Sequence, residues 1–166
     1  MIVALGDAVI DLFACPLGSD AASAEHFVPR AGGAPCNVAR VAALLGARAR
    51  FVGAVGPDGH GARLRSALET AGADTRYLTT LAPRTGVTFV RVGLDGSRSF
   101  TAYRQGASDL RLGPDELRAL GGDPLEGARW LHLTSGSVLG EPLASTAILL
   151  ADRAREANIS VSLDLN

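Results

Sequence analysis

The sequence predicts an α/β fold: a doubly wound parallel sheet with a small antiparallel β lid laid over it. Short apolar runs alternate with amphipathic stretches along most of the chain, as they do in strand–helix–strand units. Asp95-Gly96 lies between two extended runs, which indicates a hairpin, and a hairpin fits poorly in a parallel sheet. The 166 residues suffice for one main domain with one sizeable core.

The first half of the chain contributes two strand–helix pairs to the predicted sheet. Residues 2–5 and 50–55 are short apolar runs that indicate buried strands. The helix predicted over 35–45 begins with a proline, which suits the first helical turn, and is followed by a glycine, which suits the stop. Asp58 is expected to cap a second helix that continues to Ala71.

The second half adds a further strand–helix–strand unit. Residues 130–133 and 159–163 indicate strands, and residues 142–157 indicate a helix with arginines near its negative end. Asn158 suits a left-handed stop after that helix. The Asp-Pro-Leu-Glu segment at 123–126 indicates a short capped helical turn.

The lid is predicted from extended segments that fall outside this alternation. The clearest of them are the two runs that flank Asp95-Gly96. We expect lid strands at about 8–14, 25–30, 76–80 and 87–103, all inserted into a single domain that spans residues 1–166.

The predicted strand at 159–163 ends close to the last residue, Asn166. A parallel sheet needs helices on both faces, so a covering helix would normally follow this strand. We therefore expect the C-terminal half of the fold to be missing and the chain to be part of a longer protein. The alternative is a complete small domain in which 159–163 forms an exposed edge strand.

Composition and charge favour a globular protein without a polyanionic partner. Apolar residues make up 47% of the chain and charged residues 20%, a balance that disordered chains lack. The net charge of −1 provides no general attraction to nucleic acid or to a membrane surface, and we expect neither as a partner. The use of only two cysteines and an N-terminus without a basic leader favour the cytoplasm.

The most informative local feature is the run at 31–37, Ala-Gly-Gly-Ala-Pro-Cys-Asn. Paired glycines before a helix let the backbone approach a ligand closely, and the helix start supplies unpaired N–H groups. Asn37, in the first helical turn, offers both a donor and an acceptor, which suits sugar hydroxyls. The alternative is a tight turn that binds nothing.

This run is the first part of a longer pattern. The residues that carry it are Gly32, Gly33, Asn37, Ala39, Gly46 and Gly56. At this spacing they resemble the N-terminal motif of the ribokinase-like carbohydrate kinases, the PfkB family. Other segments are similar to the family in the same order along the chain, at 6–11, 55–61, 99–109, 131–137 and 164–166. The segments at 99–109 and 131–137 resemble the fructokinase branch.

The resemblance implies ATP-dependent phosphorylation of a sugar hydroxyl, with a fructokinase as the first choice. A 2-keto-3-deoxygluconate kinase is the second choice, and ribokinase follows. It implies that Asp11 accepts hydrogen bonds from sugar hydroxyls, which suits an ionised carboxylate, and that Gly32, Gly33 and Asn37 line the same pocket. The alternative for Asp11 is a solvated side chain on a lid strand, although aspartate is depleted in strands.

Two further substrate-binding residues follow from the resemblance. Arg104 would face the carboxylate or hydroxyl end of the sugar, and arginine suits either because it offers five fixed donors. Phe89 stands where related kinases carry an aromatic lid residue. The alternatives are a surface charge after a hairpin for Arg104 and an aromatic packed within its own lid for Phe89.

The phosphate-facing part of such a kinase is expected to lie later than this chain. The family carries a Gly-Ala-Gly-Asp segment at a helix start, where N–H groups hold the transferred phosphate and the Asp takes the hydroxyl proton. The sequence contains no such segment, so the catalytic base is expected beyond Asn166. Asp164 and Asn166 are expected near the phosphates, and the longer protein is expected to use ATP and Mg²⁺.

A truncated, non-catalytic sugar-binding or dimerisation module is the competing hypothesis. The free strand edges of a lid favour a homodimer. We expect no metal site in the chain, because His26, His60 and His132 lack metal-ligand spacing. Cys36 is expected to be a small buried residue, and the alternative is a thiol whose pKa is lowered by the helix start.

Overall fold

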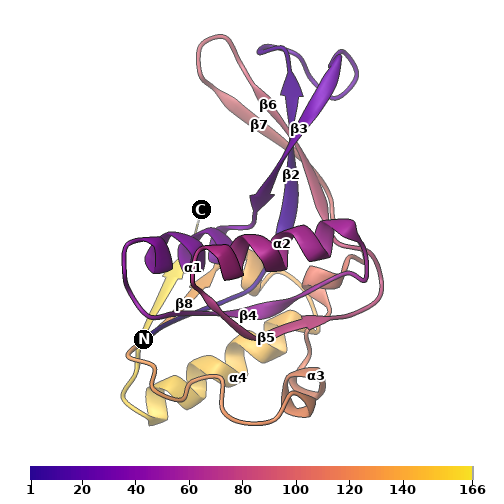
Figure 1. Ribbon diagram of the computed structural model, residues 1–166. Coiled ribbons are helices and arrows are strands. Elements are labelled where there is room, and N and C mark those ends of the chain that lie inside the picture. Colours follow the sequence, from indigo (N-terminus) through magenta and orange to yellow (C-terminus); the bar gives the residue numbers. More distant parts are fainter. Residues whose placement is uncertain (166) are drawn as a thin grey trace.

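Residues 1–165 are described by the computed structural model, and they build a large sheet with a smaller sheet above it (Figure 1). The large sheet has the strand order β5-β4-β1-β8-β9, and every neighbouring pair is parallel. Its strands are β1 (Ile2–Leu5), β4 (Ala49–Val55), β5 (Asp74–Thr80), β8 (Trp130–Thr134) and β9 (Ser160–Asp164). The predicted doubly wound parallel sheet is therefore confirmed.

Helices cover both faces of this sheet. α1 (Ala34–Leu44) and α2 (Gly59–Thr70) pack on one face, and α3 (Pro114–Ala119) and α4 (Leu143–Glu156) lie on the other (Figure 1). α3 has no counterpart in the sequence prediction, because its 6 residues are too few to display a helical period. None of the described helices is long and apolar enough to cross a membrane.

The local features that predicted the helix ends are present in the structure. Asp58 Oδ1 accepts a hydrogen bond from the Gly61 backbone N–H at 2.8 Å, which caps α2. Asn158 has a positive φ of 55° and follows α4 as the expected stop. Residues 123–126 form a turn without a helix, closed by the Glu126 N–H, which donates to the carbonyl of Asp123 at 3.0 Å.

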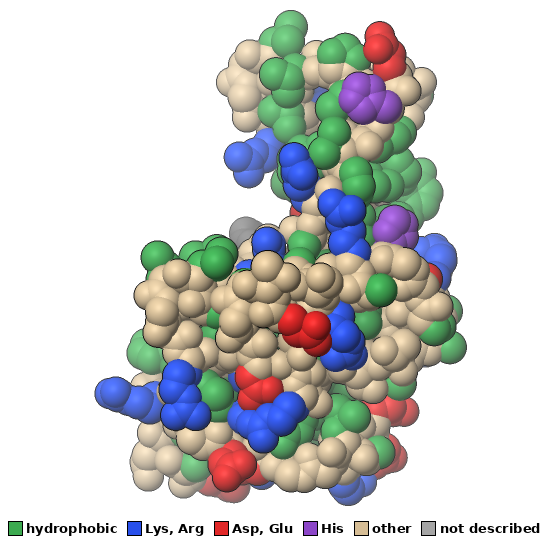
Figure 2. Space-filling model, in the orientation of Figure 1, with side chains coloured by type: hydrophobic (Ala, Val, Ile, Leu, Met, Phe, Trp, Pro, Cys, Tyr) green, Lys and Arg blue, Asp and Glu red, His purple; other side chains and the backbone are tan. Residues whose placement is uncertain are grey.

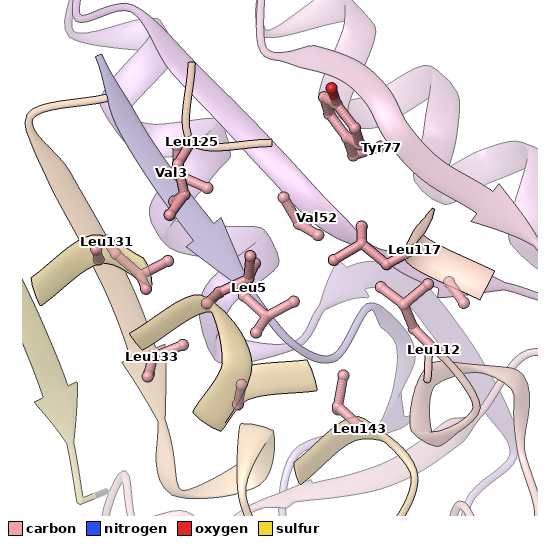
Figure 3. Close-up of a cluster of buried hydrophobic side chains, with 14 residues drawn as sticks. Val3, Leu5, Val52, Tyr77, Leu112, Leu117, Leu125, Leu131, Leu133 and Leu143 are labelled. Carbon is pink, nitrogen blue, oxygen red and sulfur yellow. The ribbon is translucent and has the colours of Figure 1, made fainter. Parts of the chain in front are cut away.

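The core is divided into two clusters, one on each face of the large sheet. Val3, Leu5 and Val52 point toward α3 and α4, where they pack with leucines of those helices and of β8 (Figure 3). Ala4 and Phe51 point the opposite way, against α1 and α2. Successive side chains of a strand face opposite sides, so each central strand contributes to both clusters.

The smaller sheet, called the lid below, has the strand order β3-β2-β6-β7. Its strands are β2 (Val9–Cys15), β3 (His26–Gly32), β6 (Val87–Val92) and β7 (Arg98–Tyr103). β2 with β3 and β6 with β7 are antiparallel pairs, while β2 and β6, which join them, run parallel. The separate antiparallel lid is confirmed with this one parallel pairing, and Figure 2 shows the lid projecting from the base.

One expected lid strand belongs to the large sheet. Residues 76–80 lie in β5, which pairs in parallel with β4. Tyr77 and Leu78 are buried on opposite faces of that sheet, in the α3–α4 cluster and the α1–α2 cluster respectively. The placement of 76–80 in the lid is therefore wrong, and the physical reason is burial on both faces, which the short sequence pattern does not reveal.

β9 is an edge strand of the large sheet within the described residues. Val161 and Leu163 are 42% and 49% exposed there, although Leu131 and Leu133 of the neighbouring β8 are buried under α4. The large sheet therefore presents half-exposed apolar side chains along this edge.

Candidate functional site

A cavity of about 640 Å³ lies between the lid and the carboxyl end of the large sheet. Asp7 follows β1, and Gly33 and Asn37 lie at the start of α1, in the region where open α/β sheets bind ligands. We call the lid face that lines the cavity its inner face. The lining residues are Asp7, Val9, Asp11, Phe13, Arg30, Ala31, Gly33, Ala34, Asn37, Thr88, Arg98, Phe100, Ala102 and Arg104.

Asp11 projects from β2 on the inner face of the lid. It pairs in register with Arg30 of β3 and with Thr88 of β6, and paired residues share a face of a sheet, so all three line the cavity. Gly32 leaves room for Asp11, because a Cβ at residue 32 would overlap the Asp11 carboxylate in its present position. One predicted glycine of the sugar motif thus makes room for the predicted sugar-binding carboxylate.

Gly33 and Asn37 form the cavity wall at the start of α1. Gly33 has a φ of 93°, in the left-handed region, and its carbonyl accepts the Asn37 backbone N–H at 2.9 Å. The Asn37 side chain is exposed, and its Oδ1 accepts from Arg40 Nη1 at 3.3 Å. The Asn37 amide therefore meets the cavity at the positive end of the helix dipole.

Carboxylates surround one arginine at the base of the lid. Arg104, which follows β7, donates from Nε and Nη2 to Asp109 Oδ2 at 2.9 and 2.6 Å. Its Nη1 lies 3.4 Å from Asp7 Oδ2. Asp109 belongs to the 3₁₀ turn Ser108–Leu110 and is fully buried. Asp7 and Arg104 both act electrostatically on Asp11, so these four side chains form one charged group.

Asp11 has the largest carboxyl pKa displacement that bears on the cavity. Its pKa is raised from the ordinary 3.8 to about 6, first by burial and second by the Asp7 carboxylate, while the Arg104 guanidinium lowers it. Asp11 therefore changes charge under mildly acidic conditions, and only its ionised form accepts hydrogen bonds through both oxygens.

We expect fold stability and sugar affinity to change in opposite directions as the pH rises through about 6. Because the folded pKa lies above the ordinary 3.8, protonated Asp11 stabilises the fold below about pH 4, and this contribution is lost as the pH rises through about 6. Sugar affinity should rise over the same range, since the ionised carboxylate is the stronger acceptor. Melting temperatures and calorimetric titrations of wild type and Asp11→Asn check both trends, because asparagine does not titrate. A difference between the two proteins that is constant with pH would contradict this assignment.

Phe89 does not line the cavity. It pairs in register with Leu12 of β2, one residue out of phase with Asp11, so it lies on the outer face of the lid. There its ring packs edge-on against Phe27 and Tyr103, with ring centroids 5.1 and 5.4 Å away. The expected contribution of Phe89 to the sugar pocket is therefore not supported, and the alternative of an aromatic packed within its own lid describes it.

Asp164 lies at the carboxyl end of the large sheet, where β1 and β8 also end. It is exposed and pairs in register with Thr134, the last residue of β8. Because the strands are parallel, this is also the edge at which β1 leads into Asp7. Asn166 lies outside the described residues, so the expected roles of Asp164 and Asn166 near phosphate stay predictions.

Cys36 lies in the first turn of α1, on its buried side, and burial raises the pKa of its thiol to about 12. The small buried residue expected from the sequence is confirmed, and the alternative of a lowered pKa is wrong.

Within residues 1–165, His, Cys, Asp and Glu side chains form no group of three or more that could hold a metal ion.

Asp7, Thr88 and Asp109 are among the polar residues at the site that the sequence alone does not single out. Asp7 had a usable sequence signal, since it follows a buried strand and a glycine at the edge where α/β sheets bind ligands. Thr88 shares a face with Asp11 only because of the β2–β6 register. Asp109 enters through its contact with Arg104, which the sequence pattern does not disclose.

A known protein family matches the chain over all of its described residues. A family profile described as "pfkB family carbohydrate kinase" matches residues 1–165. The chain therefore belongs to the pfkB family of carbohydrate kinases.

Individual relatives are named as sugar kinases and extend beyond this chain. "Probable fructokinase-4" of Arabidopsis thaliana is 35% identical over 167 residues, which cover 100% of this chain and 50% of the relative. A crystal structure of fructokinase with bound ATP from Xylella fastidiosa is similar with a TM-score of 0.84 and 35% identity, over 99% of this chain and 48% of that one. A 2-dehydro-3-deoxygluconokinase from Thermotoga maritima is similar with a TM-score of 0.88 and 25% identity, over 99% and 50%. The chain spans about half the length of the curated relatives it matches.

Proposed function

We propose that the protein to which this chain contributes transfers phosphate from ATP to a hydroxyl of a sugar, with fructose as the favoured sugar. This chain would supply the sugar site and the lid. The observation that carries the proposal is the Asp11 carboxylate, which lines the cavity with Gly32 fitted against it and Arg104 nearby. An acceptor and a multiple donor in one cavity complement sugar hydroxyls, each of which both donates and accepts.

Fructose is favoured by the names of the relatives. Plant proteins named fructokinase are 33–35% identical to the whole chain, and the fructokinase from Xylella fastidiosa is similarly close. The 2-dehydro-3-deoxygluconokinase is less similar, at 25% identity. A 2-keto-3-deoxygluconate kinase and a ribokinase remain the alternatives within the family.

The phosphate side of the reaction is proposed to involve little of this chain. The ATP-bound relative favours ATP as the donor. Asp164 and Asn166 would lie near the phosphates, and the catalytic base is expected in chain beyond Asn166. Mg²⁺ would neutralise charge by bridging phosphate oxygens, and we assign no residue of this chain to it. We keep the cytoplasm as the proposed compartment.

We also propose that the protein forms a homodimer through the lid. β3 and β7 are the edge strands of the lid, and every residue of β7 is exposed, including Phe100 at 62% and Tyr103 at 53%. An exposed strand edge with apolar side chains favours pairing with another chain. Analytical ultracentrifugation tests this proposal, and a monomer over a wide range of concentrations would contradict it.

The chain of 166 residues by itself should bind fructose and form no ADP from ATP and Mg²⁺, because the expected base lies outside it. Calorimetric titration with a panel of sugars measures binding, and a coupled assay of ADP measures phosphate transfer. Turnover that persists through purification and disappears in Asn37→Ala would show that this chain carries the chemistry alone. If no sugar of the panel binds, the proposed sugar site is wrong. Binding without turnover in a longer protein that includes the continuation would favour the non-catalytic module.

A further inference from the structure

We propose that Asp109 is a positioning residue for Arg104. By pairing with this arginine it leaves Arg104 able to bind neutral hydroxyl groups but not a carboxylate, so that the cavity selects uncharged sugars over sugar acids. The proposal rests on the proposed function, because it assumes that the cavity binds a sugar. It concerns the choice between the two substrate classes that remain open for this fold, a neutral ketose and a sugar acid whose carboxylate an arginine could bind.

Arg104 is already engaged by carboxylates of the chain. Two of its five N–H groups are donated to one oxygen of Asp109, at 2.9 and 2.6 Å, and Nη1 lies 3.4 Å from Asp7 Oδ2. The Arg104 side chain is 22% exposed, while the side chains of Asp109 and Asp7 are 0% and 8% exposed. At so buried a position these ion pairs are screened weakly by solvent, and they hold the guanidinium in place.

The buried position of Asp109 is suited to its contact with Arg104. It has no described hydrogen-bond partner on Oδ1, which is buried, so its hydrogen bonds to side chains in the described residues go to Arg104 alone. A Cβ at Gly86 would lie 2.6 Å from that Oδ1, so the absence of a side chain at residue 86 is what admits the carboxylate. Burial raises the pKa of the Asp109 carboxyl, and the Arg104 guanidinium opposes that rise because it stabilises the ionised form.

The arrangement discriminates between substrates by charge. A carboxylate that approached Arg104 would also approach Asp7, Asp11 and Asp109, and like charges in a partly buried site repel strongly. A hydroxyl group meets no such repulsion, and it can accept from the N–H groups of Arg104 that Asp109 does not use. The negative surroundings of Arg104 therefore favour a polyhydroxy substrate without a carboxylate.

Arg30 and Arg98 are the groups that could offset this effect. Both line the cavity from the lid, and both are exposed. Exposed charges are well screened by water and contribute little to binding of an anion. If they nevertheless governed the choice of substrate, a change at Asp109 would leave the preference between the two sugars unaltered.

The test is Asp109→Asn in the chain as it stands, with the dissociation constants for D-fructose and for 2-keto-3-deoxygluconate measured by calorimetry. The variant retains the shape of the side chain and removes its charge. We expect fructose to bind about tenfold more weakly and the sugar acid to bind about tenfold more tightly, as one charge-assisted interaction is released. Asp115→Asn is the matched control, since Asp115 also pairs with an arginine, Arg118, but on the exposed surface.

If Asp109 had only a structural role, its substitution would weaken the binding of both sugars by the same factor. An unchanged ratio of the two dissociation constants would therefore overturn the proposal. The wild-type ratio is a second measurement that does not depend on the folding of a variant: fructose should bind at least about tenfold more tightly than the sugar acid. Equal or tighter binding of the sugar acid by wild type overturns the selectivity and leaves the sugar site intact. Binding of neither class would overturn the proposed function as well.

Discussion

Replacement of Gly33 by alanine is expected to lower the free energy of unfolding by about 3 kcal/mol, the sum of a left-handed backbone penalty and a steric clash. Gly33 has a φ of 93°, which L-residues with a Cβ rarely adopt. The added Cβ would overlap the carbonyl oxygen of Asp7, which is backbone and cannot swing aside. Urea denaturation followed by circular dichroism measures the loss.

Gly46→Ala is the matched control for that experiment. Gly46 also has a positive φ, 86°, but a Cβ there would meet no heavy atom within 4 Å. Only the backbone penalty applies, so we expect a loss of about 1 kcal/mol. Equal losses at the two positions would show that the overlap of the added Cβ with the Asp7 carbonyl costs nothing beyond the backbone penalty.

Asp11→Ala is expected to reduce the affinity for fructose by about a hundredfold, because hydrogen bonds to an ionised acceptor are worth about 1.5–3 kcal/mol each. The variant leaves the sugar hydroxyls that Asp11 would bind without an acceptor in a partly buried cavity. The affinity of Asp11→Asn for fructose should lie between those of wild type and Asp11→Ala, since its amide retains one acceptor oxygen without the charge. Calorimetric titration of the three proteins measures this order.

Asp95→Ala provides the control on the same sheet. Asp95 lies in the turn between β6 and β7, outside the cavity, and its carboxylate accepts from Ser97 of that turn. Its loss should leave the affinity for fructose within about twofold of wild type, as for surface substitutions in general. Equal affinity of Asp11→Ala and wild type would refute the role of Asp11 and would require another acceptor in the cavity.

Much of the fold could be predicted from local patterns. The strands of the large sheet at 2–5, 50–55 and 130–133 are apolar runs, and the helix ends near Gly46 and Asn158 follow from residues that adopt a left-handed backbone. These features depend on a few neighbouring residues. The same holds for the glycines beside Asn37, whose resemblance to a family motif pointed to a sugar site before any contact was known.

The two errors of placement have a common cause. The sequence predicts residues 76–80 in the lid and Phe89 in the sugar pocket. Both segments are extended, as their sequences indicate, but the local sequence does not show which strand each one pairs with. The partner decides the sheet to which a strand belongs, and the register with β2 decides the face on which Phe89 lies.

The sequence by itself determined the class of fold, the lid hairpin, and the likeness to a family that led to Asp11, Gly32 and Asn37. Only the tertiary structure decided which charges meet. Asp7 reaches Arg104 from the distant start of the chain, and Asp109 reaches it from the 3₁₀ turn five residues further on, because the segment after β1 and the segment after β7 meet at the base of the lid. Electrostatic interactions act through space, so the pKa of Asp11 and the commitment of Arg104 depend on that convergence and on burial.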